Sequence, residues 1–242
     1  MDNALVIGVG ASEGVGAAVC RRVAREGLRV FPVARSKERL DAVAAEISAA
    51  GGTAVPIVAD CTVPEDMTRI FETIATEGGA PPRLLVYNAG NNFPAELADI
   101  TNEKFENDWR VCAFGALLCA REVLARMAPN GGGTVIFTGA TASMRARPPF
   151  ISFASAKAAE RAIAHGLARQ LGKEGVHVAH IVIDGVINGD QVKSRFPEAK
   201  EFLGDDGMLS VDAIADAMWM LHTQPRTAWT LELDLRPYKE TF

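Results

Sequence analysis

The sequence predicts an α/β fold in which a doubly wound, seven-stranded parallel sheet lies between two layers of helices. Short apolar runs alternate with helical stretches almost from end to end. Strands that are apolar on both faces, rather than alternating, indicate a sheet covered on both sides. The chain has 242 residues, and we expect them to form one domain, because no linker, repeat or change of composition interrupts this rhythm.

The elements follow in chain order. Continuous apolar runs bounded by polar or glycine residues predict strands at residues 4–9, 29–34, 55–59, 84–87, 134–138, 176–183 and 229–235. Apolar side chains that recur every three or four residues, such as Val15, Val19 and Val23, predict helices between them. These helices are expected at residues 14–26, 40–50, 64–76, 103–127, 152–173 and 211–222.

One connection, residues 184–207, is longer than the others and mixed in composition. Long connections in folds of this class are often lids or binding loops, so we expect a substrate lid here. A poorly ordered surface loop is the alternative interpretation.

Composition excludes several classes of function. The 30 acidic and 25 basic residues give a net charge of −5, which disfavours nucleic acid or anionic membrane as a partner. The four cysteines form no CxxC pair, so neither a metal site nor a dithiol redox centre is expected. No export segment or apolar run of membrane-spanning length is visible, and a cytoplasmic protein with a small-molecule partner is expected.

A glycine-rich stretch links the first strand to the first helix. Glycines there allow a sharp turn and a close approach to a pyrophosphate, which the N-terminus of the helix attracts. A tight turn without a ligand is the alternative. The residues predicted to bind a dinucleotide cofactor are Gly10, Ser12, Glu13, Gly14, Val15 and Gly16.

The end of the second strand distinguishes the two nicotinamide cofactors. An acidic residue there would hold a ribose 2′-hydroxyl, but this chain has Arg35, which can pair with a 2′-phosphate. We therefore expect NADP(H), with NAD(H) as the alternative. The carboxylate of Glu13 would repel a phosphate nearby and argues against this expectation, and a solvated Arg35 side chain without a ligand is the alternative interpretation.

With these motifs the chain resembles the short-chain dehydrogenase/reductase family, from Gly10 to about Leu235. Tyr87-Asn88-Ala89-Gly90 is similar to the family's NNAG stretch, with its first Asn changed. The resemblance implies a Rossmann-like fold and hydride transfer between a nicotinamide and a carbonyl or alcohol. It also implies that the cofactor cleft is lined by Asp60, Cys61, Asn88, Ala89, Gly90 and Ile187.

The catalytic residues that the resemblance implies are largely absent. The family's Tyr, its Ser and its Asn correspond here to Phe153, Ala140 and Cys112, and only the Lys remains, as Lys157. In the family this Lys lowers the pKa of the Tyr and bonds the nicotinamide ribose. Lys157 is therefore predicted as the catalytic residue and as a cofactor ligand, with pairing to a nearby acid as the alternative. Ala140, Thr141 and Phe153 are predicted to line the substrate pocket.

Three hypotheses remain open. The first is an NADP(H)-dependent oxidoreductase with an atypical site, whose substrate supplies its own proton path. The second is a catalytically silent cofactor-binding or regulatory protein, and the third is a partner subunit in a mixed oligomer. The resemblance also implies a homo-oligomer, a dimer or tetramer assembled through the long helices 103–127 and 152–173.

Overall fold

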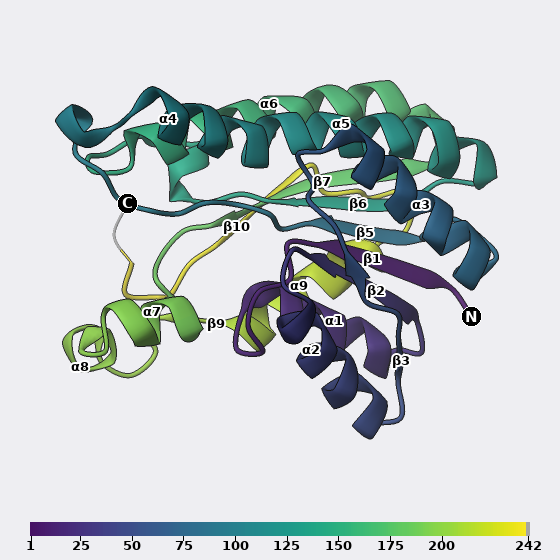
Figure 1. Cartoon of the computed structure of the whole chain (residues 1–242), viewed down its shortest axis with the longest axis horizontal. Helices are drawn as coiled ribbons and strands as arrows, with labels where there is room; N and C mark the ends of the chain where they lie inside the picture. Colours follow the sequence, from purple (N-terminus) through teal and green to yellow (C-terminus); the bar gives the residue numbers. More distant parts are fainter. Residues whose placement is uncertain (241–242) are drawn as a thin grey trace.

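Parallel strands form the centre of the protein, which a computed structural model describes over residues 1–240. The strand order is β10-β7-β6-β5-β1-β2-β3, and β4 also pairs with β2 (Figure 1). Every ladder is parallel, and the doubly wound α/β prediction is confirmed. The strands are β1 (Asn3–Ile7), β2 (Arg29–Ala34), β3 (Thr53–Ala54), β4 (Ile57–Val58), β5 (Leu84–Tyr87), β6 (Gly133–Thr138), β7 (Val176–Ile183) and β10 (Glu232–Leu235).

Helices cover both faces of the sheet, and each face has its own apolar core. One layer consists of α1 (Val15–Arg25), α2 (Lys37–Ala49) and α9 (Val211–His222). The other consists of α3 (Pro64–Gly78), α4 (Asn102–Trp109), α5 (Gly115–Glu122) and α6 (Ile151–Leu171). Strands β5, β6 and β7 are buried throughout or nearly so, because both of their faces are covered.

The predicted strand at residues 55–59 is wrong in detail. The structure has two short strands there, β3 and β4, and both pair with β2. Pro56 lies between them, and a proline has no N–H to donate to a ladder. The sheet therefore has eight strands instead of the predicted seven, and β3 and β4 lie one after the other along the same edge.

The predicted helix 103–127 is one helical run with two wider turns. Between α4 and α5 lies a π-helical turn, Arg110–Phe114, and a second follows α5 at Val123–Met127. The hydroxyl of Tyr87, on β5, donates to the carbonyl oxygen of Val111 at 2.5 Å. This bond fixes the first π turn, which carries Cys112, to the centre of the sheet.

The segment 184–207 has more structure than a loop. It contains β8 (Ile187–Asn188), α7 (Asp190–Arg195) and α8 (Ala199–Leu203), and β8 pairs with β9 (Leu209–Ser210) outside the main sheet. The strands run toward the side of the molecule on which α7 and α8 lie (Figure 1). No helix in residues 1–240 is both long and apolar enough to cross a membrane.

Candidate active site

The glycine loop after β1 is shaped by contact with the loop after β5. Gly8 has φ +90°, and a Cβ there would lie 2.5 Å from the backbone nitrogen of Ala89. Asn88 Nδ2 donates to the carbonyl oxygen of Gly8 at 2.9 Å, and a Cβ on Gly16 would lie 2.9 Å from that same oxygen. The structure thus brings two of the sequence-predicted cofactor segments into direct contact.

Room for an anion remains at the start of α1. A Cβ on Gly10 would meet no atom within 4 Å, so the backbone is open on that side. Gly14 caps α1 without a side-chain hydrogen bond, and the first turn has no acidic residue. The free N–H groups of the helix terminus, including that of Val15, therefore fit a phosphate group.

Ser12 in the glycine loop is held by hydrogen bonds to side chains of α1 and α2. Ser12 Oγ donates to Glu46 Oε1 at 2.6 Å, and Arg21 Nη1 donates to the Ser12 carbonyl at 2.9 Å. Arg21 also bonds Glu46 at 2.9 Å, so three side chains close a ring beneath the loop. Ser12 therefore holds the loop in shape through these bonds.

Arg35 and Asp60 stand at the carboxyl ends of β2 and β4. The Arg35 side chain is 72% exposed, and its Nη1 lies 4.0 Å from Asp60 Oδ2. Asp60 Oδ1 accepts hydrogen bonds from the Thr62 backbone and hydroxyl at 2.9 and 2.8 Å. Cys61 is partly buried beside the Tyr87 hydroxyl, at 3.5 Å, and burial raises the pKa of its thiol.

Phe153 lies against Cys112 and Ala140, the two residues that the resemblance matched to the family's Asn and Ser. Its ring, 6% exposed, packs with Cys112 and Ala156, and Ala140 joins the same cluster. A Cβ on Gly90 would lie 3.7 Å from the ring. The structure therefore gathers positions 112, 140 and 153 at one place, and their side chains are a thiol, a methyl group and a phenyl ring.

Lys157 lies one turn beyond Phe153 on α6 and points inward. Its Nζ donates to Glu160 Oε2 and to the Thr138 carbonyl, both at 2.8 Å, and is 5.9 Å from the Phe153 ring centroid. Burial raises the pKa of the Glu160 carboxyl, and the Lys157 ammonium works in the opposite direction. Pairing with an acid on the same helix, the alternative considered from sequence, is the arrangement present.

Thr141 is also already engaged. Its hydroxyl donates to Asp184 Oδ1 at 2.6 Å, and Arg145 Nη2 donates to both oxygens of that carboxylate, at 3.0 and 2.7 Å. Arg236 Nη2 lies 3.5 Å from it as well. Asp184, 3% exposed, thus ties the end of β7 to the segment after β6 and to the chain after β10.

A model of the short chain dehydrogenase family matches residues 3–200. The chain belongs to the short-chain dehydrogenase/reductase family. A short-chain dehydrogenase from Rhodopseudomonas palustris is 32% identical and superposes with a TM-score of 0.83, covering 98% of this chain and 99% of that one. Oxidoreductase asL5 from Sarocladium schorii is 30% identical over 199 residues, which are 82% of this chain and 75% of the relative. An alcohol dehydrogenase from the archaeon Thermococcus sibiricus, complexed with 5-hydroxy-NADP, is 25% identical with a TM-score of 0.85, covering 100% and 98%.

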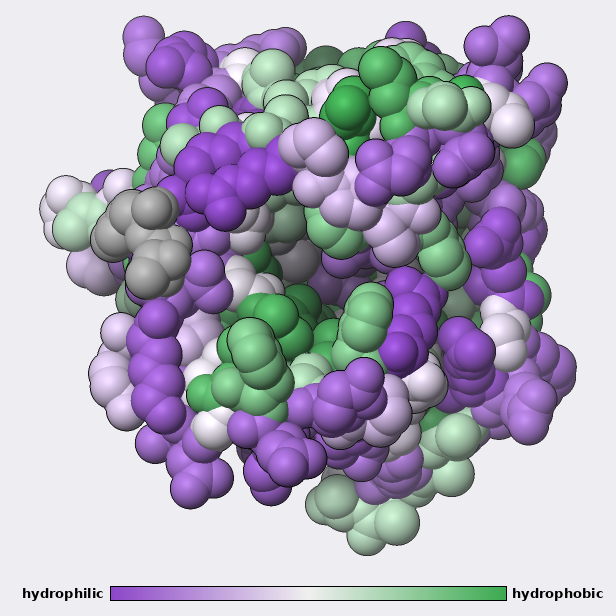
Figure 2. All heavy atoms as spheres, turned by 90° about the vertical axis from the view of Figure 1, so that its left-hand side faces the viewer, coloured by the Kyte–Doolittle hydropathy of each residue, from purple (hydrophilic) through white to green (hydrophobic). Residues whose placement is uncertain are grey.

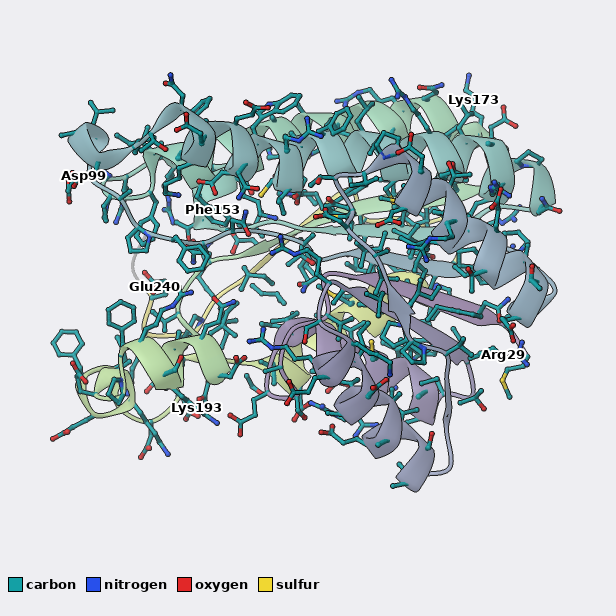
Figure 3. All side chains as sticks on the ribbon, in the orientation of Figure 1. Arg29, Asp99, Phe153, Lys173, Lys193 and Glu240 are labelled. Atoms are coloured by element: carbon teal, nitrogen blue, oxygen red, sulfur yellow. The ribbon has the colours of Figure 1, made fainter. Side chains whose placement is uncertain are left out.

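In this member of the short-chain dehydrogenase/reductase family, α7 bridges the two sides of the cleft. Lys193 Nζ pairs with Glu13 Oε2 at 2.9 Å, across 180 residues of sequence. Arg195 Nη1 donates to the Asn92 carbonyl at 3.1 Å, and its guanidinium lies 4.3 Å from the Phe93 ring centroid. Figure 2 shows a hollow in this face with apolar residues at its rim, and Figure 3 shows Phe153 and Lys193 on opposite sides of the opening.

Two site residues were missed from sequence. Glu160 follows Lys157 by three positions on one helix, which is a spacing that the sequence displays and that could have identified it. Asp184 gave no such signal, because its partners Thr141 and Arg145 lie about forty residues away.

Ile187, which was predicted to line the cofactor cleft, lies in β8 and pairs with Leu209. The chain then leads to Gly189, where a Cβ would lie 2.9 Å from the Glu13 carbonyl oxygen. Within residues 1–240 no group of three or more His, Cys, Asp or Glu side chains is placed to hold a metal ion.

Proposed function

We propose that this short-chain dehydrogenase/reductase binds NADP(H) and acts as an oxidoreductase whose substrate or solvent supplies the proton. The observation that carries the proposal is the start of α1, which has no side-chain cap and follows a loop that is open at Gly10. The pyrophosphate would lie there, and Arg35, exposed at the end of β2, is available to the 2′-phosphate. A bound nicotinamide supplies or accepts a hydride, which is the chemistry of the family.

The active-site residues of this chain limit which substrates are suitable. Phe153 has no proton to donate, and Ala140 has no hydroxyl to orient an oxygen. A positioned general acid contributes roughly 10²–10⁴-fold to such reactions, so simple ketones should react slowly. A substrate that carries its own proton donor would not need that group.

The segment 184–207 is proposed as the lid over the cleft. It touches the glycine loop through Lys193 and the loop after β5 through Arg195. Asp190 Oδ1 lies 3.7 Å from where a Cβ of Gly14 would be, next to the phosphate position. Because a carboxylate and a phosphate repel each other, cofactor binding should favour a lid position in which Asp190 is withdrawn.

Replacing Arg35 with Ala should weaken NADPH binding about 10- to 100-fold, because a charge-assisted hydrogen bond contributes roughly 1.5–3 kcal/mol. NADH binding should hardly change, since NADH has no 2′-phosphate. Fluorescence titration of both cofactors measures the difference. Arg25→Ala, which removes an exposed arginine at the far end of α1, is the matched control and should bind as the parent protein does. Tighter binding of NADH than of NADPH by the parent protein would contradict the proposal.

A silent NADP(H)-binding protein is the second candidate, and one observation favours it. Lys157 is paired with Glu160 inside the protein, so the last remaining residue of the family's catalytic set is engaged elsewhere. A panel of carbonyl, enone and imine compounds separates the two candidates. Cofactor oxidation with any member supports the oxidoreductase, and binding without oxidation supports the silent protein.

We also propose that copies of the chain assemble as a dimer or tetramer through the helical layer around α4 and α5. Four large apolar side chains are exposed here in the single chain: Phe105 and Trp109 on α4, Leu117 on α5, and Leu124 in the π turn that follows α5. Covering them would remove apolar surface from water, which stabilises an assembly. Sedimentation velocity should show a dimer or tetramer, whereas a monomer at micromolar concentration would contradict the proposal.

A further inference from the structure

The ammonium group of Lys157 is enclosed by the protein. The residue is 3% exposed, and its Nζ bonds the Thr138 carbonyl at 2.8 Å, with the Ala89 carbonyl at 3.5 Å. These carbonyls stand at the carboxyl ends of β6 and β5. The three acceptors on the ammonium are thus two strand ends and Glu160, and none of them is a catalytic group of the family.

Glu160 is the counter-ion in this arrangement. It is 0% exposed, and its Oε2 accepts from Lys157 at 2.8 Å. Within residues 1–240 its other oxygen, Oε1, accepts no hydrogen bond. A buried ion pair with an unsatisfied oxygen gains little stability over apolar residues of the same size, so stability alone does not explain the pair.

The pair also changes the electric field at position 153. A lysine four residues beyond a tyrosine, one turn along the helix, would stabilise the phenolate by its positive charge. Here a carboxylate lies 2.8 Å from that charge and counteracts it at the Phe153 ring, whose centroid is 5.9 Å from the ammonium nitrogen. Other titratable side chains near this position are Cys112, whose thiol pKa is raised by burial, and Asp108, which accepts a hydrogen bond from Ser152 Oγ at 2.6 Å.

We propose that Glu160 is a positioning residue that holds Lys157 on the strand-end carbonyls and neutralises its charge, so that position 153 receives no activation. The proposal rests on the placement of Phe153 and Lys157 in the active site, and it is independent of which cofactor binds. It implies that restoring a hydroxyl at position 153 is insufficient, since the charge that would activate it remains compensated by Glu160.

The test is a pH titration of tyrosinate absorbance in Phe153→Tyr and in Phe153→Tyr/Glu160→Gln. The second substitution should lower the pKa of the introduced phenol by about 1–2 units, because it removes the compensating negative charge. Glu174→Gln, at an exposed glutamate just beyond α6, is the matched control and should cause no shift. Tyr87 and Tyr238 are subtracted with the corresponding variants that keep Phe153. An unchanged phenol pKa with Glu160→Gln, or an equal shift with Glu174→Gln, would overturn the proposal.

A second measurement covers the case in which the glutamine variant does not fold. Thermal unfolding of Lys157→Met, Glu160→Met and the double variant tests whether the two side chains act as a pair. Each single variant should lose thermal stability, because it leaves one buried charge without its partner, and the double variant should regain most of it. Additive losses would overturn the pairing. Absence of binding to either dinucleotide would refute the proposed function instead, without affecting these readouts.

Discussion

Asp184→Ala should destabilise the protein by about 3 kcal/mol, since breaking a buried ion pair costs about 3–5 kcal/mol when one charge is left behind. The carboxylate is 3% exposed and joins Thr141, Arg145 and Arg236. The loss should fall near the lower end of that range, because the Arg145 side chain is 32% exposed and can be rehydrated. Urea unfolding at one fixed protein concentration measures the change.

Asp234→Ala provides the matched control for this experiment. Asp234 also pairs with Arg236, at 2.5 Å, but its side chain is 44% exposed. Exposed ion pairs contribute about 0–1 kcal/mol, so the control should unfold close to the parent protein. Equal losses for the two variants would show that Asp184 does not hold the three segments together.

Titration of His180 should cost the folded protein stability as the pH falls below about 6.5, whereas Glu160, whose pKa burial raises to about 7, contributes in the opposite direction. Burial lowers the pKa of His180 to about 4, against 6.5 ordinarily, while Glu232 at 3.0 Å opposes the shift. The unfolded chain therefore takes up a proton before the folded protein does, and the stability lost by pH ~4 is on the order of 3 kcal/mol. Hydrogen bonding by Arg161 lowers the pKa of Glu232 to about 2, so a further loss follows below pH ~4.5. Unfolding midpoints between pH ~8 and ~4.5 would trace the change.

His180→Gln removes this titration and keeps a donor for Glu232. As the pH falls through this range, the stability of the variant should rise relative to that of the parent protein. A residual slope should remain, because burial also lowers the pKa of His177 and His222. Parallel profiles for the variant and the parent protein would show that titration of His180 does not contribute to the pH dependence.

Most helices and strands could be predicted because the apolar runs and periodic apolar positions that identify them lie within each segment. Helix α9 begins and ends at the expected residues. Its N-terminus is capped by Ser210, whose hydroxyl oxygen accepts a hydrogen bond from the backbone N–H of Ala213. The strand at residues 55–59 was mispredicted because Pro56 interrupts an otherwise apolar run. The short elements α7 and α8 gave no long periodic signal, and they are held by distant contacts such as Lys193 with Glu13.

The candidate site was predictable where residue type alone fixes the geometry. Gly16 has neighbours that exclude a Cβ, and it belongs to the glycine-rich stretch from which the tight loop was predicted. The partner of Lys157 could not be chosen from sequence between a cofactor and an acid, because the choice depends on burial against Thr138 and Ala89. Those carbonyls come from β6 and from the loop after β5, which only the folded sheet brings together.

The ring formed by Ser12, Arg21 and Glu46 has a consequence for ligand association. A glycine-rich loop without side-chain supports would have to be immobilised by its ligand, and the lost conformational freedom would weaken binding. Here the hydrogen bonds at 2.6 to 2.9 Å already restrict the loop when the chain folds. A ligand therefore meets a preorganised loop, and the remaining entropic penalty of association falls on the proposed lid, residues 184–207.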